Sequence, residues 1–116
     1  MTILVCDDDK EIVEAIEIYL MQEGYNVEKA YDGIQAVEIM KNKKIDLMII
    51  DVMMPKLDGI RATLQIRKES RVPIIILSAK TEDADKILGL NVGADDYVTK
   101  PFSMPVLLRK VAAILR

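Results

Sequence analysis

The chain has 116 residues, of which 51% are hydrophobic and 30% are charged, so it suffices for one globular domain with a core but not for two. Its net charge is −3 at pH 7, and its basic residues are scattered among acidic ones, which argues against a nucleic-acid-binding surface. Histidine is absent, which excludes histidine-based catalytic triads and dyads and every histidine-ligated metal site.

The first half of the chain predicts alternating strands and helices, because short apolar runs alternate with apolar residues at helical spacing. Strands are predicted at residues 3–6, 26–30 and 45–50. The two helices between them have apolar faces formed by Ile12, Val13, Ile16, Tyr19 and Leu20, and by Ile34, Val37 and Met40. Gly24 ends the first helix, and Asp32 and Gly33 precede the second.

The second half repeats this alternation. A helix over residues 57–68 precedes a strand at 74–77, and a short helix at 84–91 precedes a short strand at 96–98. A last helix runs from about residue 104 to the end of the chain. The apolar faces of the first and last of these helices are Ile60, Leu64 and Ile66, and Leu107, Leu108, Val111, Ile114 and Leu115.

Five strands alternating with five helices predict an α/β, doubly wound fold, in which helices cover both faces of a parallel sheet. No linker divides the chain, so we expect one domain over residues 1–116. Cys6 is the only cysteine, which excludes an internal disulfide, suits a small core residue and favours a cytoplasmic location. The sequence has neither a signal peptide pattern nor an apolar run of membrane-spanning length, so we expect no membrane association.

Polar residues follow the central strands at their carboxyl ends, where sheets of this kind bind ligands. These residues are Asp7, Asp8 and Asp9 after the first strand, Asp51 after the third, Ser78 after the fourth, and Thr99 and Lys100 after the fifth. Paired carboxylates repel each other by roughly 4 kcal/mol at 4 Å in a partly buried site, so we expect a cation among them. An all-oxygen donor set favours Mg²⁺. Acid, metal, lysine and hydroxyl together suit phosphoryl transfer, with Asp51 as the nucleophile that forms an aspartyl phosphate.

Four segments, ILVCDDD, DLMIIDVMMPKLDG, PIIILSAK and GADDYVTKPF, resemble in order and spacing the signatures of the response-regulator receiver domain of two-component signalling. The resemblance covers essentially the whole chain and implies a flavodoxin-like (βα)5 fold with strand order 2-1-3-4-5. It also implies a switch that a sensor histidine kinase phosphorylates. Such a domain is not an enzyme, except that it assists its own phosphotransfer and dephosphorylation.

The same resemblance implies a metal site for Mg²⁺ or Mn²⁺. Asp51 is then both phosphoacceptor and metal ligand. Asp8 is the other direct carboxylate ligand, Asp7 binds through water, and Met53 contributes its backbone carbonyl.

The resemblance further implies that Ser78 and Lys100 contact the phosphoryl oxygens. Tyr97 resembles the aromatic switch that moves inward when Ser78 is drawn to the phosphoryl group, and Lys100–Pro101 resembles the cis peptide of the family. Taken alone, Tyr97 is more simply a half-buried packing residue, and Asp9 is more simply a helix cap. Met53 and Lys80 should flank the path of the hydrolytic water, and since neither positions a water well, we expect slow self-dephosphorylation.

The GADDYVTKPF segment resembles most closely the OmpR/PhoB branch, in which a winged-helix DNA-binding domain follows the receiver. No such domain is present up to Arg116, so a receiver piece of a longer regulator and a stand-alone receiver both remain open. The branch implies a phosphorylation-promoted symmetric homodimer through the fourth helix, fifth strand and fifth helix. The candidate residues are Lys86, Asp95, Asp96, Val106 and Lys110. Val106 replaces a glutamate usual in that branch, so we expect a weak dimer.

Functions of other classes fit the sequence less well. A haloacid-dehalogenase-type phosphatase requires a second aspartate two residues after Asp51, where Met53 stands. A flavodoxin-like FMN carrier needs a hydroxyl-rich loop after the first strand, where this chain has three aspartates. The alternative that stays open is a receiver-like interaction module that works without phosphorylation.

Overall fold

The computed structural model describes residues 1–79, 91 and 93–116. Five strands form one parallel sheet of order β2-β1-β3-β4-β5, which confirms the predicted fold. The elements are β1 (Thr2–Cys6), α1 (Lys10–Gln22), β2 (Asn26–Ala30), α2 (Gly33–Asn42), β3 (Leu47–Asp51), α3 (Gly59–Arg67), β4 (Ile74–Ala79), β5 (Asp96–Lys100) and α5 (Met104–Leu115). Four helices therefore lie within the described residues, and the helix predicted over residues 84–91 falls outside them except at its last position.

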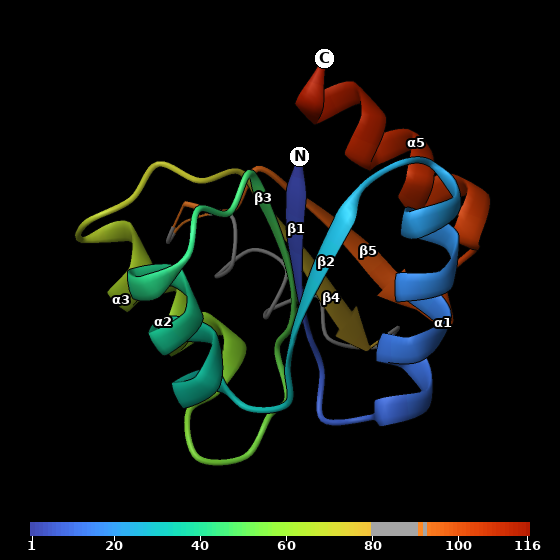
Figure 1. Cartoon of the computed structure of the whole chain (residues 1–116). Helices are drawn as coiled ribbons and strands as arrows, with labels where there is room; N and C mark the ends of the chain where they lie inside the picture. Colours follow the sequence, from blue (N-terminus) through green and yellow to red (C-terminus); the bar gives the residue numbers. More distant parts are fainter. Residues whose placement is uncertain (80–90, 92) are drawn as a thin grey trace.

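Helices cover both faces of the sheet, with α1 and α5 on one face and α2 and α3 on the other (Figure 1). The strands β3 and β4 are buried almost throughout, as continuous apolar runs require when both faces of a parallel sheet are covered. Cys6 belongs to the core between the sheet and the α2–α3 layer and is fully buried. The prediction that Cys6 is a core residue is therefore confirmed.

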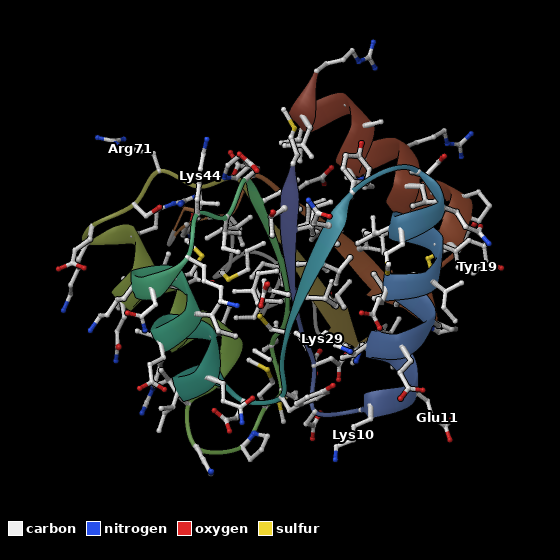
Figure 2. All side chains as sticks on the ribbon, viewed as in Figure 1. Lys10, Glu11, Tyr19, Lys29, Lys44 and Arg71 are labelled. Carbon is white, nitrogen blue, oxygen red and sulfur yellow. The ribbon has the colours of Figure 1, made fainter. Side chains whose placement is uncertain are left out.

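Three residues that the helical spacing assigned to core faces are exposed instead: Tyr19, Ile34 and Leu64. Figure 2 shows the labelled Tyr19 on the outer side of α1. Each of the three residues is adjacent in sequence to a buried residue, namely Leu20, Gly33 and Thr63. Because successive helical residues are about 100° apart, the residue beside the buried stripe turns to solvent.

An aspartate caps each of the first three helices in chain order. Asp9 accepts hydrogen bonds from the backbone N–H groups of Glu11 and Ile12 at 3.0 and 3.4 Å, which confirms the predicted cap. Asp32 caps α2 and Asp58 caps α3 in the same manner. Side-chain acceptors of this kind satisfy N–H groups that the helix itself leaves unpaired.

The edge strand β2 carries charged side chains, which discourage pairing with another chain. Glu28 on β2 pairs with Lys43 at the end of α2 (3.0 Å), and Lys29 pairs with Glu17 of α1 (3.2 Å). Both pairs lie at the surface. Among the described residues, no helix has both the length and the apolar character needed to cross a membrane.

Candidate functional site

The parallel strands bring the predicted site residues to one edge of the sheet. The register pairs Cys6 with Ile50 and Asp51 with Leu77, so Asp7 extends β1 beside Asp51 at the end of β3. On the other side of β3, Ala79 of β4 pairs with Lys100 of β5. The carboxyl ends of four strands therefore deliver the acidic residues, Ser78 and Lys100 to the same rim.

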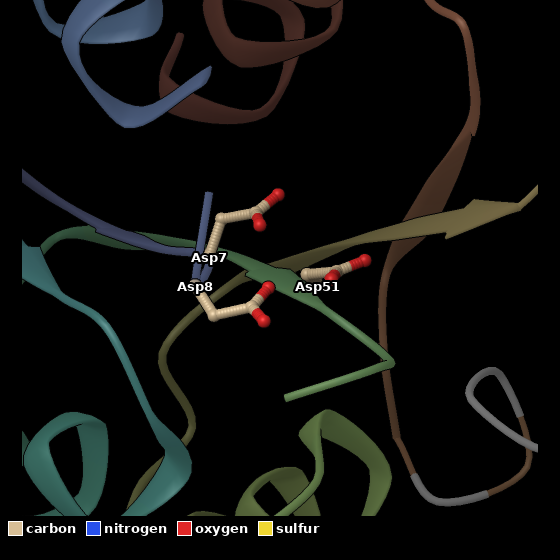
Figure 3. A group of neighbouring side chains, drawn as sticks. All are labelled: Asp7, Asp8 and Asp51. Atoms are coloured by element: carbon tan, nitrogen blue, oxygen red, sulfur yellow. The ribbon is translucent and has the colours of Figure 1, made fainter. Parts of the chain in front are cut away.

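Three carboxylates form a cluster at this rim (Figure 3). One oxygen from each of Asp7, Asp8 and Asp51 lies within 4.8 Å of the others. Asp7 and Asp51 are buried, whereas Asp8 is exposed. Such a set of hard oxygen donors without thiolate or imidazole suits a small divalent cation, so these residues fit the ion that the sequence predicts.

Lys100 reaches across the sheet edge from β5 into the cluster. Its Nζ donates a hydrogen bond to Oδ2 of Asp7 at 2.7 Å and lies 3.3 Å from Oδ1 of Asp51. Burial lowers the pKa of Lys100, but the hydrogen bond to Asp7 and the charge of Asp51 outweigh it, so the net shift is upward. Lys100 is therefore a fixed positive charge beside the phosphoacceptor candidate.

The two buried aspartates of the cluster, Asp7 and Asp51, hold their protons more tightly than ordinary carboxyl groups. Burial, followed by the negative charge of Asp7, raises the pKa of Asp51 from 3.8 to about 6, and Lys100 opposes this rise. Burial also raises the pKa of Asp7 against the opposing hydrogen bond from Lys100. Both shifts show that burial outweighs the positive charge of Lys100 at this rim.

Ser78 is fully buried, and within the part of the chain that the structure describes its hydroxyl has no hydrogen-bond partner. A buried hydroxyl without a partner costs free energy. Ser78 directly follows Leu77, which is the register partner of Asp51, so Ser78 lies at the rim where the cluster lies.

The loop between β3 and α3, residues 52–58, directly follows Asp51 and carries Met53. Gly59 closes this loop: its N–H donates to the Val52 carbonyl at 2.8 Å. A Cβ atom at Gly59 would overlap the Asp51 carbonyl oxygen, so only glycine lets α3 begin this close to the site. The Met53 side chain is 67% exposed.

The two aspartates among the candidate residues of the dimer face have different partners. Asp96 of β5 pairs with Lys110 of α5 at 2.9 Å, whereas Asp95 accepts hydrogen bonds from Arg67 at 3.2 Å and from the Ile74 N–H at 2.8 Å. Val106 is partly buried at the start of α5. Lys86, like Lys80 of the proposed water path, lies outside the described residues.

The switch candidate Tyr97 is 37% exposed on β5, which fits an outward position. The peptide bond between Lys100 and Pro101 is cis, as the resemblance implies.

The sequence reasoning did not assign a role in the site to either Gly33 or Gly59. Both glycines follow an aspartate that caps a helix, and both pack against a backbone carbonyl where a Cβ atom would overlap. The two Asp-Gly pairs at helix starts next to the proposed site could have indicated these roles. Glycine at such a position indicates that another backbone segment approaches closely.

The family of response regulator receiver domains matches residues 3–112 of the chain. The chain is 46% identical over 115 residues to the response regulator GtcR of Aneurinibacillus migulanus, covering 99% of this chain and 48% of that relative. It thus spans about half the length of that relative.

Solved structures agree with this match. The receiver domain of the Francisella response regulator 1452 is 40% identical, with a TM-score of 0.92 over 98% of this chain and 95% of that one. A two-component response regulator from Clostridium difficile is 31% identical, with a TM-score of 0.95 over 100% and 96%. The receiver domain of the sensor histidine kinase PA1611 from Pseudomonas aeruginosa, with a magnesium ion in its active site cleft, is 35% identical, with a TM-score of 0.86 over 98% and 96%.

Proposed function

Because this chain belongs to the family of response regulator receiver domains, we propose that Asp51 accepts the phosphoryl group through which such domains signal. One observation carries the proposal: Asp51 ends a buried strand between two other carboxylates and the Lys100 ammonium, 3.3 Å away. The strand holds the nucleophile in place, and the lysine offers a positive charge for the phosphoryl oxygens.

In the proposed reaction, a carboxylate oxygen of Asp51 attacks the phosphorus of a phosphohistidine on a sensor kinase, or of a small donor such as acetyl phosphate. The new P–O bond forms as the bond from phosphorus to the donor atom breaks, and the donor leaves with that electron pair. The attacking carboxyl must be ionised. Lys100 favours the ionised form, since its charge opposes the upward shift in the pKa of Asp51.

Asp8, Asp51 and the Met53 backbone carbonyl would hold Mg²⁺ or Mn²⁺. Asp7 would contribute through a water molecule, because both of its oxygens already accept hydrogen bonds, from Asp9 N–H at 3.0 Å and from Lys100. When bound, the cation neutralises charge on the phosphoryl oxygens. The magnesium ion in the PA1611 receiver supports this assignment.

After transfer, Lys100 shifts from the Asp51 carboxylate to the phosphoryl oxygens, and the Ser78 hydroxyl donates a hydrogen bond to them. The Ser78 hydroxyl thereby gains a hydrogen-bond partner, which it lacks among the described residues before the transfer. Its movement towards the phosphoryl group opens space that the partly exposed Tyr97 side chain can enter. The face formed by β5 and α5 thereby differs between the two states.

We extend the proposal to a cytoplasmic regulator of the OmpR/PhoB branch, which controls transcription through a DNA-binding output domain. The GtcR relative is about twice as long as this chain, which supports an output segment. The phosphorylated domain pairs weakly through the β5–α5 face, and the Asp96–Lys110 pair contributes charges of both signs to it. A stand-alone receiver fits the same site chemistry.

The test is phosphorylation by acetyl phosphate and Mg²⁺, followed by intact-protein mass spectrometry. The parent protein should gain one phosphoryl mass, and Asp51→Asn should gain none. Asp58→Asn, which alters a helix cap on the same loop, is the matched control and should react like the parent. Equal labelling of Asp51→Asn would refute the assignment, and an unlabelled parent would favour the phosphorylation-independent interaction module.

A further inference from the structure

The β3–α3 loop is fastened to the start of α2 at two places that the proposed function does not use. Gly33 packs so closely on the loop that a Cβ atom there would overlap the Leu57 carbonyl oxygen. Next to it, Oδ2 of Asp32 lies 3.6 Å from Nζ of Lys56. Asp32 and Gly33 are consecutive, so one short segment holds Lys56 and Leu57 of the loop.

The loop adopts an unusual backbone where it is held. Lys56 has a positive φ of 67°, a conformation that is uncommon for a residue other than glycine. The Leu57 N–H donates to the Pro55 carbonyl at 2.7 Å, which makes a tight three-residue turn. Such a conformation persists where surrounding contacts support it.

Asp32 can serve the helix and the loop at once. Its Oδ1 accepts the Gln35 N–H at 2.8 Å as the cap of α2, which leaves Oδ2 for Lys56. The Asp32 side chain is 7% exposed, so its charge is screened less than in a pair that lies wholly at the surface. The preceding residue, Tyr31, lies under the Lys10 ammonium, 5.5 Å from the ring centroid. The segment between β2 and α2 therefore contacts both the β3–α3 loop and the first residue of α1.

We propose that Asp32 and Gly33 are positioning residues, which hold the β3–α3 loop in its metal-binding conformation. The inference rests on the proposed function, because the loop affects the metal only if the Met53 carbonyl is a ligand. The ends of the loop are fixed independently at Asp51 and Gly59. Loosening the contact with the start of α2 therefore frees the loop between these ends and leaves the phosphoacceptor in place.

A purely electrostatic role and a positioning role of Lys56 predict opposite changes in Mg²⁺ affinity when this residue is substituted. Removing the positive charge in Lys56→Met should strengthen cation binding if only electrostatics matter, because like charges repel. If the lysine positions the loop, the same substitution weakens binding. Asp32→Asn, which retains a capping oxygen, weakens binding on either account, so Lys56→Met is the decisive variant.

The experiment measures the Mg²⁺ dissociation constant of the unphosphorylated protein by isothermal titration calorimetry. Lys56→Met and Asp32→Asn should each bind Mg²⁺ roughly three- to tenfold more weakly than the parent. This loss of affinity is smaller than is usual for a group that orients a metal ligand, because Lys56 is exposed. Gly33→Ala should lose more Mg²⁺ affinity, since the added Cβ atom displaces the loop. Glu28→Gln, which breaks the similar but more exposed pair with Lys43, is the control and should leave the constant within about twofold.

Lys56→Met that binds Mg²⁺ as tightly as the parent, or more tightly, would overturn the positioning role. The variant retains the length of the side chain and alters an exposed residue, so it should fold even if Gly33→Ala does not. The two proposals fail differently: a parent protein that binds no Mg²⁺ would overturn the metal site itself. Phosphorylation is not needed for the measurement, so the result does not depend on the role of Asp51 as nucleophile.

Discussion

Two aspartates bracket the apolar run of β3, and the fold uses them differently. Asp46 precedes the strand, and its Oδ2 accepts the Thr2 backbone N–H at 2.8 Å, which fastens β1 to β3. Asp51 ends the strand in a crowd of carboxylates and has its pKa raised to about 6 by burial and by Asp7. A backbone N–H thus satisfies Asp46, whereas Asp51 lies among other carboxylates, where the proposed reaction requires a nucleophile.

The same contrast holds between the two ends of the sheet. At the amino end, Arg67 donates to the Gly93 carbonyl at 2.8 and 3.0 Å, to the Val72 carbonyl at 2.6 Å and to Asp95 at 3.2 Å. At the carboxyl end, within the described residues, the buried Ser78 hydroxyl has no partner. One end satisfies its polar groups and stabilises the fold, whereas the other keeps bonding capacity for a ligand.

The largest effect on stability should come from substituting Arg67 at the amino end of the sheet. Arg67→Met removes a guanidinium that links the end of α3 to the segment before β5 and leaves carbonyl oxygens unpaired, so we expect a loss of about 3 kcal/mol in the free energy of unfolding. Urea unfolding measures it. Arg61→Met, on an exposed residue of the same helix, is the control. Mg²⁺ affinity of folded Arg67→Met should match the parent, and a large loss of Mg²⁺ binding would contradict the division between the two ends.

A substitution of Asp51 at the carboxyl end of the sheet should instead increase the free energy of unfolding. With metal removed, the pKa of Asp51 is about 6 in the folded state against 3.8 as its ordinary value, so the folded state holds the proton more tightly. This contribution to stability is fully present below pH 4, falls as the pH rises to about 6 and is absent above it. At pH 7.5, Asp51→Asn should therefore be more stable than the parent by about 1 to 2 kcal/mol, allowing for solvent screening.

Thermal unfolding of both proteins at pH 4.5 and 7.5 in EDTA checks the sign. The gain for Asp51→Asn should be large at pH 7.5 and small at pH 4.5, where the parent carboxyl is protonated. Asp46→Asn, which retains an oxygen acceptor for the Thr2 N–H, should show no gain at pH 7.5. A stabilised Asp46→Asn would remove the contrast between the two aspartates.

The arrangement of the elements was predictable because it depends on local patterns. Apolar runs of strand length alternate with helical spacing, and the rule that ligands bind at the carboxyl ends of parallel strands brings Asp7, Asp8 and Asp51 together. The cluster geometry confirms that these residues meet. Their individual roles in phosphorylation stay predictions.

What escaped prediction depends on contacts between distant segments. The hydrogen bond from Arg67 of α3 to Asp95 joins segments 28 residues apart in the sequence, and no local pattern indicates it. Gly33 and Gly59 could be recognised as helix-start residues, but the carbonyl oxygens that exclude a Cβ atom there come from other segments. The pairing of Lys56 with Asp32 likewise joins two loops.

Two buried hydroxyls test whether a lack of partners alone marks a functional residue. Thr63 in α3, like Ser78, is fully buried and has no hydrogen-bond partner among the described residues. Thr63→Val preserves the shape and removes the unpaired hydroxyl, so it should stabilise the fold by about 1 kcal/mol without changing the response to phosphorylation. Ser78→Ala should also fold. In this variant, however, beryllofluoride, a phosphoryl mimic, should change the NMR chemical shifts of Tyr97 less than it does in the parent. Equal responses in both variants would remove the distinction.

The smallest effect concerns the lifetime of the phosphorylated state. The Met53 side chain is 67% exposed and has no hydrogen-bonding group suited to orient a water in line with the phosphoryl bond. Met53→Asn supplies an amide while leaving the backbone carbonyl, so it should shorten the lifetime by less than about tenfold, equivalent to about 1 kcal/mol or less in the barrier. Mg²⁺ affinity and thermal stability should stay the same. Decay of the phosphorylated protein after donor removal, at constant Mg²⁺, gives the rate, with Met53→Leu as the apolar control. If Met53→Asn and Met53→Leu decay equally fast, the lifetime is set by the grip of Lys100 and Ser78 on the phosphoryl oxygens, and Lys100→Arg should then change it more than any substitution at Met53.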